Sequence, residues 1–153
     1  MRNVRRTLIG LGLAAVMTLT LGAQQKGGKK AQSLYERLGG KPAITAVVDE
    51  FVARVAADTK INRYFAAAAG DPARLAAFKG KLVDQICQAS GGPCTYTGKN
   101  MKEAHAGMGI TGAEFDALVG DLVGALDKFK VPEREKGELL GVLGPMKSDI
   151  VTK

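Results

Sequence analysis

The sequence predicts an all-α fold, and three observations support this prediction. Between residues 41 and 151, apolar residues recur every three or four positions in four long stretches, which is the spacing of one face of a helix. Glycine and proline separate these stretches and supply the signals at which helices begin and end. No segment shows the alternation of apolar and polar residues that is typical of a half-buried strand. The 153-residue chain suits a single domain.

The first helical stretches are a short helix and a long one. In residues 33–40, Ser33 and Glu36 have the spacing of a capping box, and Gly39–Gly40 ends the helix. The first long helix is expected over residues 41–58, with Pro42 in its first turn. Its apolar face consists of Ile44, Val47, Val48, Phe51, Val52 and Val55.

A short helical linker over residues 61–70 leads to the second long helix, which is expected over residues 71–92. Asp71 is the expected N-cap residue and Pro72 follows it, while Gly91–Gly92 ends the helix. Its apolar face consists of Leu75, Phe78, Leu82, Val83 and Ile86.

The next part of the sequence contains a loop, a brief helix and the third long helix. Residues 94–100 form the expected loop, and residues 101–107 allow at most two helical turns. Thr111 and Glu114 form a second capping box at the start of the helix expected over residues 111–130. The apolar face of that helix consists of Phe115, Leu118, Val119, Leu122, Val123 and Leu126.

The fourth long helix is expected over residues 131–151. Pro132 lies at its start, and the pair Gly144–Pro145 is expected to kink it. Its apolar face consists of Leu139, Leu140, Val142, Leu143, Met146 and Ile150.

Residues 1–23 have the composition of a secretory signal peptide. Three arginines within the first six residues precede an apolar run over residues 8–21, and cleavage is expected after Ala23. The run is short for a membrane span, which needs about 20 apolar residues, but an uncleaved N-terminal anchor is the alternative. We therefore expect a periplasmic or secreted protein that is attached to a membrane only if this segment is retained.

Residues 24–32 are polar and rich in glycine and lysine, as is typical of a flexible linker. The predicted domain then covers residues 33–151. The net charge of +7 arises partly from the arginines of the signal segment and partly from the lysines of this linker. No stripe of Arg and Lys with interleaved aromatic residues follows, so nucleic-acid binding is not expected.

The two cysteines, Cys87 and Cys94, lie seven residues apart. In an oxidising compartment such a pair can form a disulfide, and closing so small a loop stabilises a fold by about 2.5 kcal/mol in the chain-entropy model. The alternative is two separate thiols, with Cys87 buried on a helix. The spacing matches neither the C-x-x-C of redox motifs nor the C-x-x-C-H of c-type haem attachment.

His105, in the segment NMKEAHAGMGI, is the only histidine of the chain. The sequence has no nucleophile elbow, phosphate loop or dinucleotide fingerprint, and one histidine with two cysteines makes a weak zinc site. A metal held by one side chain needs a cofactor that supplies its other ligands, as haem does. Apolar helix faces before and after His105 suit such a cofactor. From the residues alone, His105 is either a haem ligand or an ordinary surface histidine.

Four segments resemble a known family: SLYERLGG, AITAVVDEFVARVAAD, GGPCTYTGKNMKEAHAGMGIT and FDALVGDLVGAL. Over residues 33–151 the chain is similar to the group I truncated haemoglobins. This resemblance implies a two-over-two sandwich of helices around a b-type haem. It also implies that His105 is the proximal iron ligand and that Phe65 packs on the haem.

On the distal side the chain departs from the pattern of the family it resembles. Relatives usually have Phe-Tyr where this chain has Phe51–Val52, so Val52 replaces the tyrosine that would donate a hydrogen bond to bound oxygen. The next two distal positions correspond to Phe78 and Leu82, where relatives often have glutamine. We therefore expect an apolar distal face, weak retention of O₂ and relatively preserved binding of CO.

Lys81 lies one residue before Leu82, at the expected rim of the haem pocket. Some relatives use a lysine near this position as a sixth iron ligand, and others use it to contact a haem propionate. A solvated or propionate-pairing Lys81 is the simpler interpretation. Lys102 is a second candidate for contact with a propionate.

The resemblance implies reversible binding of O₂, CO or NO for storage, delivery or sensing, and it favours a binding protein over an enzyme. NO dioxygenation is an alternative that requires an external electron-donor protein. Electron transfer through a six-coordinate haem that uses Lys81 is another, and a haem-free helical interaction domain is a third. The apolar distal face argues against peroxide chemistry, which benefits from polar groups near the iron.

Overall fold

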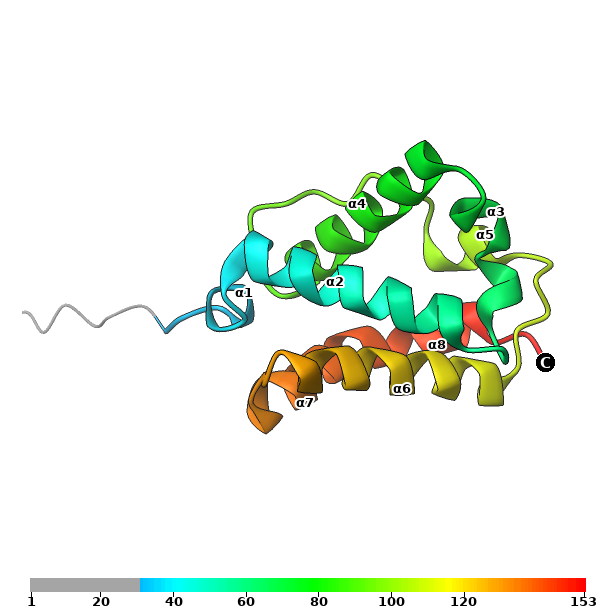
Figure 1. Cartoon of the computed structure of the whole chain (residues 1–153). Coiled ribbons are helices and arrows are strands. Elements are labelled where there is room, and N and C mark those ends of the chain that lie inside the picture. The colour runs from blue at the N-terminus through cyan, green and yellow to red at the C-terminus, as the bar shows by residue number, and fades with distance from the viewer. Residues whose placement is uncertain (1–30) are drawn as a thin grey trace, which may run out of the picture. The chain divides into compact units, whose positions relative to one another are not determined.

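The computed structural model of the protein describes residues 31–153 (Figure 1). The predicted signal peptide and most of the predicted linker lie outside these residues. Helices, turns and loops make up the described part, and residues 31–153 contain no β-strand, so the all-α prediction is confirmed. None of the helices in this part is both long enough and apolar enough to cross a membrane.

The helical elements follow one another along the chain as Figure 1 shows. The four long helices are α2 (Gly40–Ala57), α4 (Pro72–Ala89), α6 (Gly112–Lys128) and α7 (Glu133–Leu143). The short helices are α1 (Leu34–Arg37), α3 (Ala66–Ala69), α5 (Met101–His105) and α8 (Lys147–Ile150). Two 3₁₀ turns precede α3 and α8, over Asn62–Tyr64 and Gly144–Met146.

Helix α2 lies between the other long helices. Its contacts with α4 on one side and α6 on the other are the most extensive in the domain, and α2 and α4 are stacked over α6 and α7 (Figure 1). The inward faces of these helices form the core, because burying their apolar stripes removes that surface from water. The core residues are Ile44, Val47, Val48, Phe51, Val55, Ile61, Val83, Ile86, Cys87, Leu122, Ala125, Leu126 and Leu139.

The predicted helix starts agree with the structure. Ser33 and Glu36 form a reciprocal capping box at α1, and Thr111 and Glu114 form another at α6. The Asp71 side chain accepts a backbone N–H of the first turn of α4 at 2.8 Å. Each of these caps satisfies an N–H group that has no partner inside its helix.

The last predicted helix is interrupted rather than kinked. Helix α7 ends at Leu143, a 3₁₀ turn follows, and α8 begins at Lys147. Pro145 in that turn has no backbone N–H, and its ring is incompatible with a continuous α-helix at this position. The interruption separates α8 from α7, and α8 packs against α5 instead.

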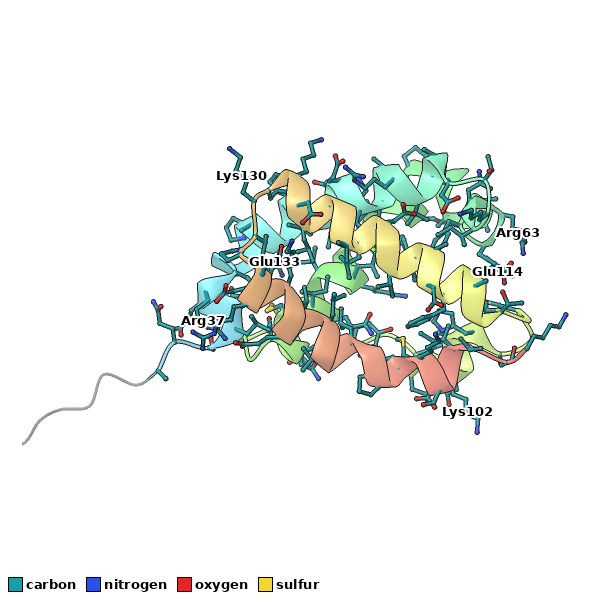
Figure 2. The ribbon with its side chains drawn as sticks, turned by 90° about the horizontal axis from the view of Figure 1, so that it is seen from below. Arg37, Arg63, Lys102, Glu114, Lys130 and Glu133 are labelled. Atoms are coloured by element: carbon teal, nitrogen blue, oxygen red, sulfur yellow. A yellow bond between two sulfur atoms is a disulfide. The ribbon has the colours of Figure 1, made fainter. Side chains whose placement is uncertain are left out.

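Ion pairs join the chain segments at one end of the domain. Arg37 of α1, labelled in Figure 2, donates to Glu135 and Glu138 of α7. Lys136 is only 8% exposed, and its Nζ lies 2.5 Å from a carboxylate oxygen of Asp127 at the end of α6. A buried charge is tolerated when it is paired in this way, so these contacts fix α7 against α1 and α6.

Candidate functional site

His105 is the last residue of α5, and its side chain is half-buried. Its Nδ1 lies 2.7 Å from the backbone carbonyl oxygen of Met101, one turn earlier in the helix. A carbonyl oxygen only accepts hydrogen bonds, so in the neutral ring Nδ1 carries the proton and Nε2 keeps its lone pair. A backbone partner of this kind both orients an imidazole and leaves Nε2 available to a metal.

Helix α5 is barely more than one turn long and contains no fully buried residue, so neighbouring elements must support it. The Asn100 side chain caps it by accepting a backbone N–H of its first turn at 2.8 Å. α8 is the element that contacts it most. Met101 packs against a second apolar cluster, whose buried members are Ile110, Phe115 and Ile150.

The turn after His105 depends on two glycines. Gly107 has a φ of 76° and Gly109 a φ of 63°, a backbone conformation that residues with a Cβ adopt only with strain. The chain can therefore reverse directly after α5. The carbonyl oxygen of Ile110 then accepts the backbone N–H of Thr152 at 2.9 Å, so the C-terminal residues hold this turn in place.

Phe78 and Leu82 lie one turn apart on α4, and both are half-buried. Phe65, directly before α3, packs against Phe78 with ring centroids 5.6 Å apart and ring planes tilted by 56°. Phe65 and Leu82 also pack against the main core. Three of the predicted site residues thus form one apolar surface.

The two candidates on α2 occupy different environments. Phe51 is 7% exposed and belongs to the main core, whereas Val52 is half-buried and packs against that core. Neither side chain carries a polar group. These positions therefore offer no hydrogen-bond donor to a bound ligand.

The two candidate lysines are exposed. Lys81 lies on α4 and forms no ion pair within residues 31–153, while its neighbour Lys79 donates to Asp49 at 2.8 Å. Lys102 lies on α5 and points away from the helices in Figure 2.

Sequence reasoning did not identify Gln85 as a residue of this region. It lies on α4 three residues after Leu82 and seven after Phe78, and this spacing is the signal that could have placed it on the same helix face. Its side-chain amide nitrogen lies 3.5 Å from the sulfur of Met101 and 3.3 Å from the sulfur of Met146. Gln85 therefore connects α4 with both α5 and the turn before α8.

Comparison with known proteins agrees with this architecture. The family model described as bacterial-like globin matches residues 33–152. A group 1 truncated haemoglobin of Mycolicibacterium paratuberculosis is 38% identical over 120 residues, which are 78% of this chain and 85% of that protein. The chain belongs to the group 1 truncated haemoglobins. A haem cofactor and binding of diatomic gases such as O₂ follow from this family.

Solved structures resemble this truncated haemoglobin over most of its length. The truncated haemoglobin of Tetrahymena pyriformis in its Fe(III) form has a TM-score of 0.72 and 31% identity, with 80% of this chain and all of that chain covered. The 2/2 haemoglobin of a Synechococcus species, solved in the cyanomet state with covalently attached haem, has a TM-score of 0.71 and 30% identity at the same coverage. The predicted two-over-two sandwich is confirmed.

A disulfide between Cys87 and Cys94 settles the alternatives that the sequence leaves open. Cys87 is completely buried in α4, and Cys94 lies in the loop that leads to α5. The backbone N–H of Gly92 also donates to the carbonyl of Cys87 at 2.8 Å. A Cβ at Gly92 would lie 2.5 Å from the Tyr35 ring and 2.7 Å from the Cys87 sulfur, so this close approach requires glycine.

Glu114 fixes the segment that carries Phe65. Its carboxylate accepts the Thr111 backbone N–H at 2.9 Å and the hydroxyl of Tyr64 at 3.0 Å, and it pairs with Arg63. These contacts, led by the Thr111 N–H bond, lower the pKa of Glu114 to about 2. Figure 2 shows Arg63 and Glu114 side by side. The residue preceding Phe65 is thereby connected to the start of α6.

The residues of this truncated haemoglobin fit a haem. Residues 31–153 contain no group of three or more His, Cys, Asp or Glu side chains able to hold a metal ion. A metal in this part of the chain would therefore need other ligands, and a porphyrin provides four nitrogens. His105 offers one nitrogen lone pair, while Phe65, Phe78 and Leu82 form an apolar surface of the kind that a porphyrin buries.

Proposed function

We propose that this truncated haemoglobin binds haem b through Nε2 of His105 and uses it to bind O₂, CO or NO reversibly. The observation that carries the proposal is the hydrogen bond from His105 Nδ1 to the Met101 carbonyl at 2.7 Å. This bond assigns the ring proton to Nδ1, so the free lone pair belongs to Nε2. Haem, when bound, would supply an iron that can take a diatomic gas.

The distal side of the proposed site consists of Val52, Phe78 and Leu82. None of these side chains can donate a hydrogen bond. A donor to the partly negative outer atom of bound O₂ contributes about 1–3 kcal/mol, and this chain has none at these three positions. We therefore infer rapid release of O₂, with less effect on CO because bound CO is less polar.

Lys81 lies at the rim of the proposed site. Its exposed position on α4 favours contact with a haem propionate or with solvent over burial beside the iron. This favours reversible gas binding over electron transfer through a six-coordinate haem. NO dioxygenation would require an electron donor from outside the chain.

Absorption spectra of the purified protein test the proposal. Spectra of the oxidised, reduced and CO-bound forms should show a b-type haem that is five-coordinate when reduced and binds CO directly. A reduced six-coordinate spectrum that Lys81→Ala abolishes would support the electron-transfer alternative instead. A protein purified without any haem absorption, and unable to take up added haemin, would exclude the proposed function.

We also propose that the protein acts after export, as a periplasmic or secreted protein. The support is the signal-like composition of residues 1–23, which lie outside the described residues, together with the disulfide between Cys87 and Cys94. Structural disulfides persist in oxidising compartments. Mass spectrometry of the protein from a cell fractionation should find an N-terminus at Gln24. Recovery of the intact chain in the cytoplasm would contradict export.

A further inference from the structure

Gln85 is a half-buried polar residue on the face of α4 that carries Phe78 and Leu82. Phe78 and Leu82 precede it at helical spacing, and all three side chains are half-buried. Placing a primary amide at such a position costs free energy unless its hydrogen bonds are made. In the described part of the chain, the Gln85 amide nitrogen donates hydrogen bonds to the sulfurs of Met101 and Met146.

These two methionines belong to two elements that follow α4 in the chain. Met101 is the first residue of α5, and Met146 lies in the 3₁₀ turn before α8. Both pack against the second apolar cluster, which contains Ile110, Phe115 and Ile150. The Gln85 amide is therefore the side chain of α4 that donates hydrogen bonds to α5 and to the turn that precedes its supporting helix.

Met101 extends this connection to His105. Its sulfur accepts the amide N–H of Gln85, and its backbone carbonyl accepts the Nδ1–H of His105 at 2.7 Å. A continuous series of contacts thus runs from the face of α4 that carries Phe78 and Leu82 through Met101 to His105. Because α5 has no fully buried residue of its own, this contact adds to the support that α5 receives from α8 and from the second apolar cluster.

We propose that Gln85 is a positioning residue that holds α5, and with it Nε2 of His105, in a fixed orientation relative to the Phe78–Leu82 face of α4. The proposal rests on the proposed role of His105 as the haem ligand. The competing role for this amide is a direct hydrogen bond to the bound gas. The geometry of the amide favours positioning, because its N–H groups are directed to α5 and to the turn before α8.

The test compares Gln85→Met with the matched control Gln88→Met. Methionine preserves the length and packing of the side chain but removes its N–H donors. Gln88 lies on the same helix and is exposed. Its side-chain oxygen accepts the backbone N–H of Tyr96, in the loop before α5, at 2.6 Å. Both variants are studied as full-length folded proteins, and circular dichroism verifies their helix content.

Three measurements distinguish positioning from ligand binding. Transfer of haem to an excess of an apoglobin acceptor should be about three- to fivefold faster for Gln85→Met than for wild type, which corresponds to one hydrogen bond of net strength near 1 kcal/mol. The iron–histidine stretching band of the reduced protein should shift or broaden. Amide hydrogen exchange of residues 101–105 should become faster, while the ratio of O₂ to CO dissociation rates stays unchanged. Gln88→Met should leave the exchange of residues 101–105 as in wild type.

Two results would overturn the proposal. In the first, Gln85→Met leaves haem transfer, the iron–histidine band and hydrogen exchange unchanged. In the second, it changes O₂ release alone, which would make Gln85 a ligand-bonding group. A wild-type protein that takes up no haem would contradict the proposed function, and the exchange of residues 101–105 would still decide whether Gln85 fixes α5.

Discussion

The imidazole of His105 and the backbone carbonyl of Met101 are joined by a hydrogen bond of 2.7 Å within α5. This contact determines which ring nitrogen carries the proton and therefore which nitrogen can bind a metal. It also makes the orientation of the ring depend on the position of α5. The contacts that support α5 are consequently as important to the proposed site as the histidine itself.

Replacement of His105 by glycine should remove the iron ligand and leave a space of about the size of the imidazole ring. We expect His105→Gly to be purified with little or no haem, because the remaining apolar contacts offer no bond to the iron. Added imidazole, which can occupy the vacated space, should restore the haem absorption bands. The measurement is a haemin titration with and without imidazole. Haem binding by the variant that is as tight as in wild type would show that another residue is the ligand.

Introduction of a hydrogen-bond donor at Val52 should slow the release of O₂. We expect Val52→Tyr to release O₂ about ten- to a hundredfold more slowly, because a charge-assisted hydrogen bond contributes about 1–3 kcal/mol. Release of CO should change less. Val52→Phe is the matched control, since it adds the ring without the hydroxyl. Equal O₂ dissociation rates for Val52→Tyr and Val52→Phe, measured by stopped flow, would argue against an apolar distal face as the cause of rapid release.

Glu114 should make the stability of the domain depend on pH in the acidic range. Its pKa in the folded protein is about 2, below the ordinary value of 4.5. The stabilising contribution is therefore complete above about pH 4.5 and is lost as the pH falls towards 2. We expect Glu114→Gln to lower the thermal midpoint at pH 7, and the difference from wild type to shrink as the pH falls below 4.5.

Thermal unfolding followed by circular dichroism between pH 2 and pH 7 measures this difference. Glu103→Gln is a suitable control, because Glu103 is exposed on α5 and its side chain forms no ion pair within residues 31–153. A difference between wild type and Glu114→Gln that is independent of pH would show that the contacts of Glu114 act through packing and not through its charge.

The bridge between Cys87 and Cys94 should contribute measurably to stability. For a loop of this length the chain-entropy model gives about 2.5 kcal/mol. The free energy of unfolding of the double variant, Cys87→Ala with Cys94→Ala, should therefore be lower than that of wild type by about this amount. Urea unfolding with and without a reducing agent measures the effect. Wild type should be destabilised by the reductant and the double variant should not respond to it. Identical curves for wild type in both conditions would contradict a structural role for the bridge.

Local signals in the sequence were sufficient to predict where the long helices lie. The capping pairs Ser33–Glu36 and Thr111–Glu114 act within a single turn, so their residue types alone indicate where α1 and α6 begin. Apolar spacing likewise identified α2 and α4. The end of α7 at Leu143 was only partly predicted, because a proline can either bend a helix or end it, and packing of the following segment against α5 decides between these outcomes.

The sequence by itself determined that the chain is helical, that its single histidine lies in a brief helix, and that Val52, Phe78 and Leu82 are apolar. Only the tertiary structure decided that Phe51 lies within the core and that Gln85 connects α4 to α5. The physical reason is the sequence separation between the residues that interact. Helix periodicity, capping and the bond between His105 and Met101 depend on residues within about one turn, whereas the contacts of Gln85 with Met101 and Met146 join residues far apart in the sequence, and folding alone brings them together.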